Sequence, residues 1–239
     1  MNDSIEPIFI IGDVHGCYKT LLALIELFPN KQNSKICFVG DLIDKGPNSK
    51  AVIDFIKDNN YDCVLGNYEK YFIEYSQYLE KKLSYFDIKS WFGKNDGKET
   101  INSYKKDGML DEKTLLEHSK WLQTLPLYLE YKDIKIKNRY LVVTHSHVFD
   151  KWKYKDYSKE SREYRNFENT VLNSRLKDFD NLEIFNVYGH TPIEDLILED
   201  YEVNIDLGCV YAKIIKGNEG KLCALEFPSM KIFTQENLD

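Results

Sequence analysis

The chain begins with short apolar runs that alternate with longer amphipathic stretches. Three such runs occur within its first seventy residues, each followed by a Gly-Asp or Gly-Asn pair and a helical pattern: residues 8–11, 36–39 and 63–65. Buried strands that alternate with helices predict βαβ crossovers and at least one parallel sheet. We therefore expect an α/β fold whose functional site lies at the carboxyl ends of the strands.

The rest of the chain continues this alternation less regularly. Residues 70–130 are mostly helical and polar, and residues 148–180 are typical of surface helices and loops. Further strands are expected at 139–144, 183–188 and 203–205. A hairpin is expected in the tail, formed by 212–216 and 222–227 around Gly217-Asn218-Glu219-Gly220. Since no Pro-, Ser- or Gly-rich linker divides the chain, we expect a single domain over residues 1–239.

Composition narrows the classes of protein that this could be. The 239 residues are 43% hydrophobic and carry a formal net charge of −7. The apolar content excludes global disorder, and the acidic balance argues against nucleic acid as a partner, because phosphate neutralisation needs a positive face. No apolar run approaches the ~20 residues that span a membrane, and no secretory pattern is present. Five dispersed cysteines without a Cys-x-x-Cys pair favour a cytoplasmic protein with reduced thiols. Nothing in the sequence indicates an oligomeric state.

Polar residues recur just past the ends of the expected strands. They are Asp13 and His15, Asp41 and Asp44, Asn67, His145, and His190. Carboxylate, amide and imidazole groups without thiolates suit Mn²⁺, Fe or Zn²⁺, and two cations about 3.5–4 Å apart would need about this many ligands. The alternative is that Asp and Asn only cap the following helices. That explanation would suffice for one Gly-Asp pair but not for three in register with two strand-end histidines.

These residues resemble the motifs of the calcineurin-like metallophosphoesterases, and within them those of the bacterial phosphoprotein phosphatases. The strong matches are Gly12-Asp13-Val14-His15-Gly16, Gly40-Asp41-Leu42-Ile43-Asp44-Lys45-Gly46, Gly66-Asn67-Tyr68-Glu69, Thr144-His145 and Gly189-His190-Thr191-Pro192. Weaker matches occur at residues 95–104, 125–128, 172–175 and 204–211, so the resemblance covers nearly the whole chain. The chain is also similar to symmetrical diadenosine tetraphosphatases, which share the same metal motifs.

The resemblance implies a two-sheet β-sandwich flanked by helices in four layers, classed as α/β or, in some schemes, α+β. It also implies two divalent cations, with manganese expected and iron or zinc as alternatives. The first would be held by Asp13, His15 and Asp41, and the second by Asp41, Asn67, His145 and His190, with Asp41 bridging. A hydroxide that bridges the metals would attack phosphorus in line. The substrate phosphate would contact Arg175, Asn67 and Lys45, of which Arg175 can bind it through two hydrogen bonds.

Two positions depart from the family pattern. Lys45 replaces an Arg, which keeps the charge but loses the planar fork. Tyr68 replaces the His that, held by the carboxylate at the position of Asp44, protonates the leaving group. Tyr has an ordinary pKa of about 10 against about 6.5 for His, and general acid catalysis is typically worth ~10²–10⁴-fold. Asp44 and Tyr68 are therefore the expected catalytic pair, in altered form. His147 could replace the missing acid only if the strand before it continues, whereas His118 is expected to be structural.

Three functions are compatible with these residues. The first, which the motifs favour, is a metal-dependent phosphomonoesterase of the protein serine/threonine phosphatase type, acting on a phosphorylated protein or a small phosphoester. The second is a symmetrical diadenosine tetraphosphate hydrolase or phosphodiesterase, which Tyr68 favours because an anhydride leaving group needs less help from an acid. The third is a phosphate-binding regulatory protein with weakened catalysis. For an active enzyme, Tyr68 predicts faster turnover of aryl or anhydride-type phosphates than of alkyl phosphoserine.

Overall fold

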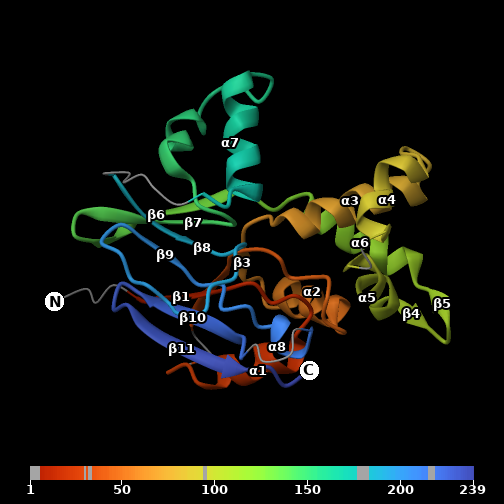
Figure 1. Ribbon diagram of the computed structural model, residues 1–239, viewed down its shortest axis with the longest axis horizontal. Coiled ribbons are helices and arrows are strands. Elements are labelled where there is room, and N and C mark those ends of the chain that lie inside the picture. The colour runs from red at the N-terminus through yellow and green to blue at the C-terminus, as the bar shows by residue number, and fades with distance from the viewer. Residues whose placement is uncertain (1–5, 30, 32–33, 94–95, 177–182, 215–218) are drawn as a thin grey trace.

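Two β-sheets pack face to face at the centre of the molecule, and helices cover their outer faces (Figure 1). The computed structural model describes residues 6–29, 31, 34–93, 96–176, 183–214 and 219–239. Within these ranges, no helix combines the length and the apolar character needed to cross a membrane. All five cysteines are buried free thiols.

The first sheet has the strand order β11-β10-β1-β2-β3. Its strands are β1 (Ile8–Ile11), β2 (Lys35–Phe38), β3 (Asp62–Cys63), β10 (Lys221–Phe227) and β11 (Lys231–Glu236). The three strands from the beginning of the chain are parallel, as their apolar runs predicted, and β10 and β11 extend the sheet in antiparallel fashion. The carboxyl ends of β1, β2 and β3 therefore meet at one edge.

The second sheet has the order β6-β7-β8-β9. Its strands are β6 (Tyr128–Ile136), β7 (Arg139–Thr144), β8 (Ile184–Tyr188) and β9 (Glu202–Asn204). The last three run parallel to one another, and β6 pairs with β7 in antiparallel fashion. This sheet thus supplies a second set of parallel strand ends.

Alternation along β1 shows why its sequence is apolar throughout. Ile8 and Ile10 enter the core between the sheets, whereas Phe9 and Ile11 pack on the other side among residues of the covering helices. A strand with both faces buried needs apolar residues at every position, since successive side chains point to opposite faces. The run at 8–11 is therefore a central strand.

Helices complete the outer layers. On the first sheet lie α1 (Tyr18–Glu26) and α2 (Ser49–Asp58), and on the second lie a 3₁₀-helix, η2 (Phe149–Tyr154), and α7 (Arg162–Asn173). Phe167 of α7, for example, shares a buried cluster with Val142 and Ile184 of the second sheet. The expected helix-flanked sandwich of two sheets is confirmed.

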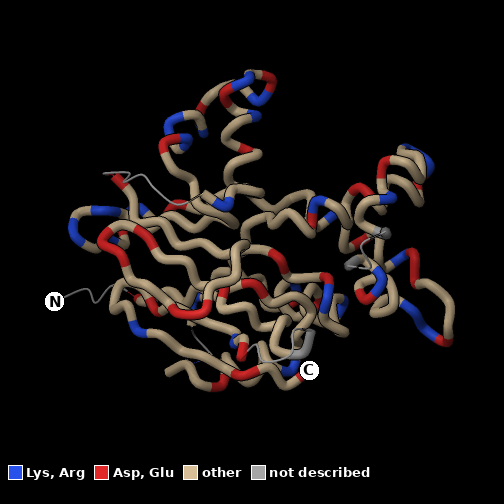
Figure 2. Tube along the Cα trace, viewed as in Figure 1, with Lys and Arg blue, Asp and Glu red and all other residues tan. Residues whose placement is uncertain are grey.

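Residues 67–93 and 96–122 form a helical arm that projects from one end of the sandwich (Figure 1). Its elements are α3 (Asn67–Leu79), α4 (Tyr85–Gly93), α5 (Asp96–Ser103), β4 (Lys105–Lys106), β5 (Met109–Leu110) and α6 (Glu112–Leu122). Aromatic contacts hold the arm together, with the Phe72 ring 6.4 Å from that of Trp91 and 5.5 Å from that of Tyr104. Figure 2 shows acidic and basic residues interspersed along the arm and around α7.

The expected hairpin in the tail is wrong in its pairing. Residues 211–214 form a short helix, α8 (Tyr211–Ile214), instead of the start of a strand, and the part of the expected hairpin at 215–218 lies outside the described residues. The physical reason is a turn at Gly208, whose φ of +67° lets Tyr211 N donate to Gly208 O at 2.9 Å. The hairpin in this region is instead β10 with β11.

Candidate metal centre

Side chains from five loops meet where the parallel strands of both sheets end. The structure brings together all six residues that the sequence predicts as ligands: Asp13, His15, Asp41, Asn67, His145 and His190. The ligand atoms of Asp13, His15 and Asp41 all lie within 4.8 Å of one another, and so do those of Asp41, His145 and His190. Asp41 belongs to both groups, which is the position that a bridging carboxylate requires.

Left-handed backbone conformations aim three of these side chains inward. The φ angle is +45° at His15, +48° at Asp41 and +72° at His190. Residues other than glycine seldom adopt this region, and such strain costs on the order of 1–3 kcal/mol per residue. A neighbouring glycine leaves the space that a ligand needs, since a Cβ at Gly189 would lie only 2.0 Å from Asp13 Oδ1. The backbone conformation of these loops therefore allows the ligand side chains to lie close together.

Backbone carbonyls fix the orientation of two of the histidines. His15 Nδ1 lies 2.8 Å from Ile43 O, and His145 Nδ1 lies 2.9 Å from Val39 O. Because a carbonyl oxygen can only accept, each Nδ1 carries the proton and each Nε2 presents its lone pair to the centre. This is the usual second contact of a histidine that binds a metal through its other nitrogen.

The donor atoms of the second group face one another at short range. His145 Nε2 lies 2.9 Å from Asn67 Oδ1, 3.0 Å from His190 Nδ1 and 3.3 Å from Asp41 Oδ1. The imidazole nitrogen, the amide oxygen and the carboxylate oxygen each carry a lone pair that can bind a metal, and these lone pairs point toward one another. A divalent cation satisfies these acceptors together, and the residues therefore fit the metal that the motifs imply.

The first group also accommodates a positive charge. Lys45 Nζ lies 2.9 Å from His15 Nε2, beside the carboxylates of Asp13 and Asp41. The ammonium contacts the ring of Tyr68 as well, 3.9 Å from its centroid. The ammonium of Lys45 therefore lies against the ligand atoms of this group.

Burial shifts the pKa values of the carboxylates and of the imidazoles in opposite directions. It raises the pKa of Asp41 to about 7, against the charges of Lys45 and Arg175, and it lowers the pKa of His145 and His190 to about 3. The pKa of Asp13 is also raised, first by burial and then by its neighbours Asp206 and Asp41. A bound divalent cation would favour ionised carboxylates and neutral imidazoles together, and it would offset the repulsion between the neighbouring carboxylates.

Two functional residues were missed by the sequence reasoning. Asp206 follows β9, is buried, and accepts a hydrogen bond from Gly208 N at 2.9 Å. Burial raises its pKa to about 7, and its charge in turn raises the pKa of Asp13. Its signal was available, because it follows a strand end as the predicted ligands do.

Glu69, the second missed residue, holds the backbone of the loop that carries Asp41. Its carboxylate accepts hydrogen bonds from Asp41 N at 2.9 Å, Leu42 N at 2.8 Å and Gly66 N at 2.9 Å. One fully buried side chain therefore ties the loop after β2 to the start of α3. It is the last residue of the motif Gly66-Asn67-Tyr68-Glu69.

The expected catalytic pair, Asp44 and Tyr68, is arranged differently from the family pattern. The carboxylate of Asp44 is buried and accepts hydrogen bonds from Trp91 Nε1 and Thr100 Oγ1, both in the helical arm. Tyr68 instead packs against the edge of the His15 ring, with ring centroids 5.1 Å apart, and against Lys45. Asp44 therefore anchors the arm to the sheet edge.

The two remaining histidines lie away from the ligand groups. Strand β7 ends at Thr144, and His147 pairs through Nε2 with Glu202 while its ring packs against Phe149. The idea that His147 replaces the missing acid is therefore wrong, because the strand on which it depended does not continue.

His118 is buried in the helical arm. Its Nδ1 lies 2.8 Å from Tyr104 Oη, and its Nε2 lies 3.0 Å from Asp54 Oδ1. This is the structural environment that the sequence predicted for it.

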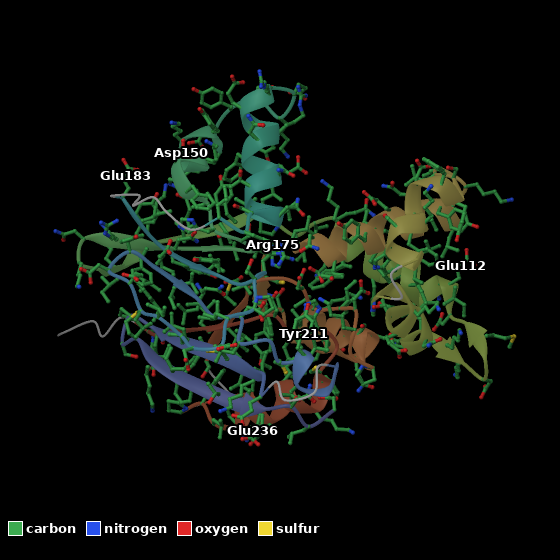
Figure 3. All side chains as sticks on the ribbon, viewed as in Figure 1. Glu112, Asp150, Arg175, Glu183, Tyr211 and Glu236 are labelled. Atoms are coloured by element: carbon green, nitrogen blue, oxygen red, sulfur yellow. The ribbon has the colours of Figure 1, made fainter. Side chains whose placement is uncertain are left out.

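A cavity of about 220 Å³ opens beside the second donor group. It is lined by Asn67, Tyr68, Tyr71, Ser90, Trp91, Asn173, Arg175 and His190. Arg175 follows α7 and is exposed, and Figure 3 shows it below the end of that helix, where the sandwich and the arm meet. The cavity thus has a metal-ligand floor, aromatic walls and one guanidinium at its rim.

Comparison with known proteins identifies this arrangement. The pattern of the calcineurin-like phosphoesterases matches residues 6–210. The chain belongs to the calcineurin-like phosphoesterase family. Members of this family are hydrolases that use divalent metals, and the two donor groups supply candidate ligands in this phosphoesterase.

Relatives of this phosphoesterase include named nucleotide hydrolases. It is 29% identical over 235 residues to the asymmetrical bis(5′-nucleosyl)-tetraphosphatase PrpE of Bacillus subtilis, covering 87% of this chain and 88% of that protein. Among solved structures, a candidate diadenosine tetraphosphatase superposes with a TM-score of 0.64 at 20% identity, covering 98% of this chain and 95% of that one. A protein serine/threonine phosphatase from Saccharomyces cerevisiae superposes with a TM-score of 0.53 at 16% identity, covering 100% of this chain and 82% of that one. These two superpositions confirm the fold.

Proposed function

We propose that this phosphoesterase hydrolyses phosphoric anhydrides of the dinucleoside polyphosphate class. The proposal rests on the two residues, Tyr68 and Asp44, at the positions where the family pattern has a general acid and the carboxylate that holds it. Tyr68 stands where the family has His, and the carboxylate of Asp44 accepts hydrogen bonds from Trp91 and Thr100. An anhydride releases a phosphate, which leaves without a proton more readily than the alkoxide of serine does, so this substrate class depends least on a general acid.

The residues around the cavity divide the work. When bound, two divalent cations would supply a hydroxide nucleophile and neutralise phosphate charge. Asp41 would hold both cations, and Arg175 and Lys45 would bind phosphate oxygens, Arg175 through two hydrogen bonds. Tyr68, Tyr71 and Trp91 give the cavity aromatic walls, which suit a nucleobase because every base has a π face.

The names of the relatives support the same substrate class. The Bacillus subtilis relative, alike over most of both chains, is an asymmetrical bis(5′-nucleosyl)-tetraphosphatase. By this analogy the expected products from diadenosine tetraphosphate are ATP and AMP, whereas symmetrical cleavage would yield two ADP. Manganese as the metal and a cytoplasmic location are further parts of the proposal.

The second candidate is a phosphomonoesterase of the serine/threonine protein phosphatase type. The sequence around Asp44 and the stretch 95–104 favour it, and within that stretch Thr100 Oγ1 accepts a hydrogen bond from Asp44 N at 2.9 Å. Asn95, which begins the stretch, lies outside the described residues. This candidate requires protonation of an alkoxide leaving group, for which the cavity provides Tyr68.

A substrate panel with the Mn²⁺-loaded protein tests the proposal. The substrates are diadenosine tetraphosphate, a phosphoserine peptide, nitrophenyl phosphate and bis-nitrophenyl phosphate. We expect the highest kcat/KM for diadenosine tetraphosphate and the lowest for the peptide. If the peptide is hydrolysed at least as efficiently as the dinucleotide, the phosphomonoesterase candidate replaces the proposal. Bound metal without turnover of any substrate would indicate a phosphate-binding regulatory protein.

Restoring the acid provides a second test. Tyr68→His should raise phosphoserine turnover relative to nitrophenyl phosphate only modestly, because Asp44 remains bound to Trp91 and Thr100. Tyr68→His combined with Trp91→Phe frees one carboxylate oxygen and should raise that ratio further, towards the ~10²-fold lower limit of acid catalysis. Tyr68→Phe, which keeps the ring and removes the hydroxyl, is the matched control. An unchanged ratio in the double variant contradicts the leaving-group argument.

A further inference from the structure

A second and larger cavity lies outside the metal centre, between the segment that leads into β6 and the segment that joins η2 to α7. It measures about 500 Å³ and is lined by Leu125, Pro126, Leu127, Tyr128, Lys155, Asp156, Tyr157, Lys159 and Tyr164. Because three of these residues are tyrosines, we name it the tyrosine cavity. Its volume lies within the range of about 300–1,000 Å³ that is usual for small-molecule sites.

The lining chemistry combines ring faces with a sheltered positive charge. Tyr128 packs by edge contacts on Trp152 and Phe167, which holds its ring in place at the cavity wall. The Lys155 side chain is only 14% exposed, although its ion-pair partner, Asp156, is 75% exposed. Because Asp156 is exposed, water can solvate its carboxylate if an anionic ligand replaces it at Lys155. The cavity therefore suits a ligand that carries both an aromatic ring and a negative charge.

The tyrosine cavity is close to the metal centre on two sides. On one side, Leu65 N donates to Pro126 O at 2.9 Å, and the ligand Asn67 follows only two residues later. On the other side, α7 carries Tyr164 in the tyrosine cavity and Asn173 in the metal-centre cavity. Nine residues of helix separate these two positions by about 14 Å.

One ion pair joins helix α7 to helix α3. Lys70 of α3 lies 3.1 Å from Glu168 of α7, and Glu168 is one turn beyond Tyr164. Helices α3 and α7 therefore face each other between the two cavities, and a chain of phosphates that leaves the metal centre in this direction would meet Lys70 on its way.

We propose that the tyrosine cavity binds the distal nucleoside of a dinucleoside polyphosphate whose phosphate chain lies over the metal centre. The base would stack on the tyrosines, and Lys155 would bind the adjoining phosphate. This inference rests on the proposed function. It predicts that the phosphate chain must be long enough to connect the two cavities, so diadenosine diphosphate should gain nothing from the second one.

Substitutions in the tyrosine cavity test this inference in the Mn²⁺-loaded full chain. Tyr157→Ala and Lys155→Met are compared with the wild type on diadenosine tetraphosphate and on adenosine 5′-tetraphosphate, which has the same phosphate chain without the distal nucleoside. In Tyr157→Ala, loss of one stacked base should raise KM for the dinucleotide about tenfold with kcat little changed, and KM for adenosine 5′-tetraphosphate should stay within twofold. Lys155→Met should raise KM for both substrates, because both carry the phosphate that Lys155 would bind. Tyr85→Ala, at a tyrosine on α4 that is 60% exposed, is the matched control and should change neither substrate.

The outcomes separate this inference from the proposed function. If the wild type hydrolyses diadenosine tetraphosphate efficiently and both cavity variants match it, the proposed function stands and the distal site is wrong. Equal losses on both substrates in Tyr157→Ala would show a structural effect and would also overturn the site. If the wild type hydrolyses nitrophenyl phosphate but neither nucleotide, the proposed function fails and the site fails with it. If free AMP alters nitrophenyl phosphate turnover through Tyr157 while KM for the dinucleotide is unaffected, the cavity is an effector site and not a substrate site.

Discussion

At the sheet edge the ligand side chains are held by backbone groups, whereas the walls of the cavity above them are held by contacts between side chains. His15 and His145 are oriented by carbonyl oxygens, and the loop of Asp41 is held by three backbone N–H groups bound to Glu69. The walls come from the helical arm and from the residues after α7. The metal chemistry therefore depends on backbone geometry, and the substrate preference on how helices pack.

This difference explains how one position of the site could change while its ligands remained. Replacing the family's His by Tyr68 changes a residue of the cavity wall and none of the ligands, and the carboxylate of Asp44 links the sheet edge to the arm through Trp91. A change at Asp13 or Asp41, by contrast, would disturb both a carboxylate and the tight backbone turns around it. Variants at the edge should therefore remove activity, and variants in the walls should redistribute it among substrates.

The largest effect is expected from Asp41→Asn at the edge. Asp41 contributes to both donor groups, so the amide should weaken both metal sites while leaving the fold intact. Loss of several kcal/mol of charge stabilisation corresponds to a fall in kcat of roughly 10³-fold or more. Metal content after dialysis and turnover of nitrophenyl phosphate measure this result. Full metal content with near wild-type turnover would show that the bridging carboxylate is not at Asp41.

Glu69→Gln tests whether backbone anchoring matters without touching a ligand. The variant replaces one of the two carboxyl oxygens that accept from three backbone N–H groups by an amide NH₂, which can only donate, so a buried N–H group loses its acceptor at a cost of about 1–3 kcal/mol in the free energy of unfolding. Metal affinity should fall about 10- to 100-fold, as for other groups that orient ligands. Isothermal titration with Mn²⁺ and chemical denaturation measure both effects. Glu74→Gln, on the same helix, should change neither, and an equal effect there would remove the positioning role from Glu69.

The same distinction accounts for what could be predicted from the sequence. The strands and their ligands were predictable because each apolar run is local and each polar pair directly follows it, as at Ile8–Ile11 and Asp13. The four-layer sandwich followed from the resemblance. The tail was not predictable by the same reasoning, because a single left-handed turn at Gly208 converts an apolar segment into the helix α8.

The walls were harder to predict because their contacts join distant residues. The hydrogen bond from Trp91 to Asp44 spans 47 residues, and that from Thr100 to Asp44 spans 56. No local pattern marks Trp91 as the partner of a buried carboxylate. The tyrosine cavity likewise combines residues near 126 with residues near 157, and only the packed fold brings them together.

Arg175→Ala should affect the walls without affecting the edge. Loss of the guanidinium removes both charge-assisted hydrogen bonds to the phosphate, so KM for phosphoester substrates should rise at least about tenfold while metal content stays unchanged. Arg175→Lys should recover only part of the loss, because lysine cannot bind phosphate through a planar fork. Steady-state kinetics at several substrate concentrations separate KM from kcat. Arg165→Ala, at an exposed arginine on α7 that donates to Glu160 O, is the control, and a similar change there would assign the effect to general surface charge.

The smallest effect concerns the pH dependence of the helical arm, where His118 is buried between Tyr104 and Asp54. Burial lowers the pKa of His118 below its ordinary value. The folded chain therefore binds a proton on this group less readily than the unfolded chain does. The stabilisation is complete above pH 6.5 and is lost as the pH falls towards the lowered value, at a rate of at most about 1.4 kcal/mol per pH unit.

His118→Gln, which keeps one donor and one acceptor, should therefore show a smaller loss of stability on acidification than the wild type. The difference between pH 7.5 and pH 5.5 should be smaller by up to about 1 kcal/mol. Chemical denaturation of the metal-loaded proteins at the two pH values measures this difference, and the titration of the other histidines cancels when the two proteins are compared. If the two proteins lose stability equally, the acid sensitivity of the molecule does not come from His118.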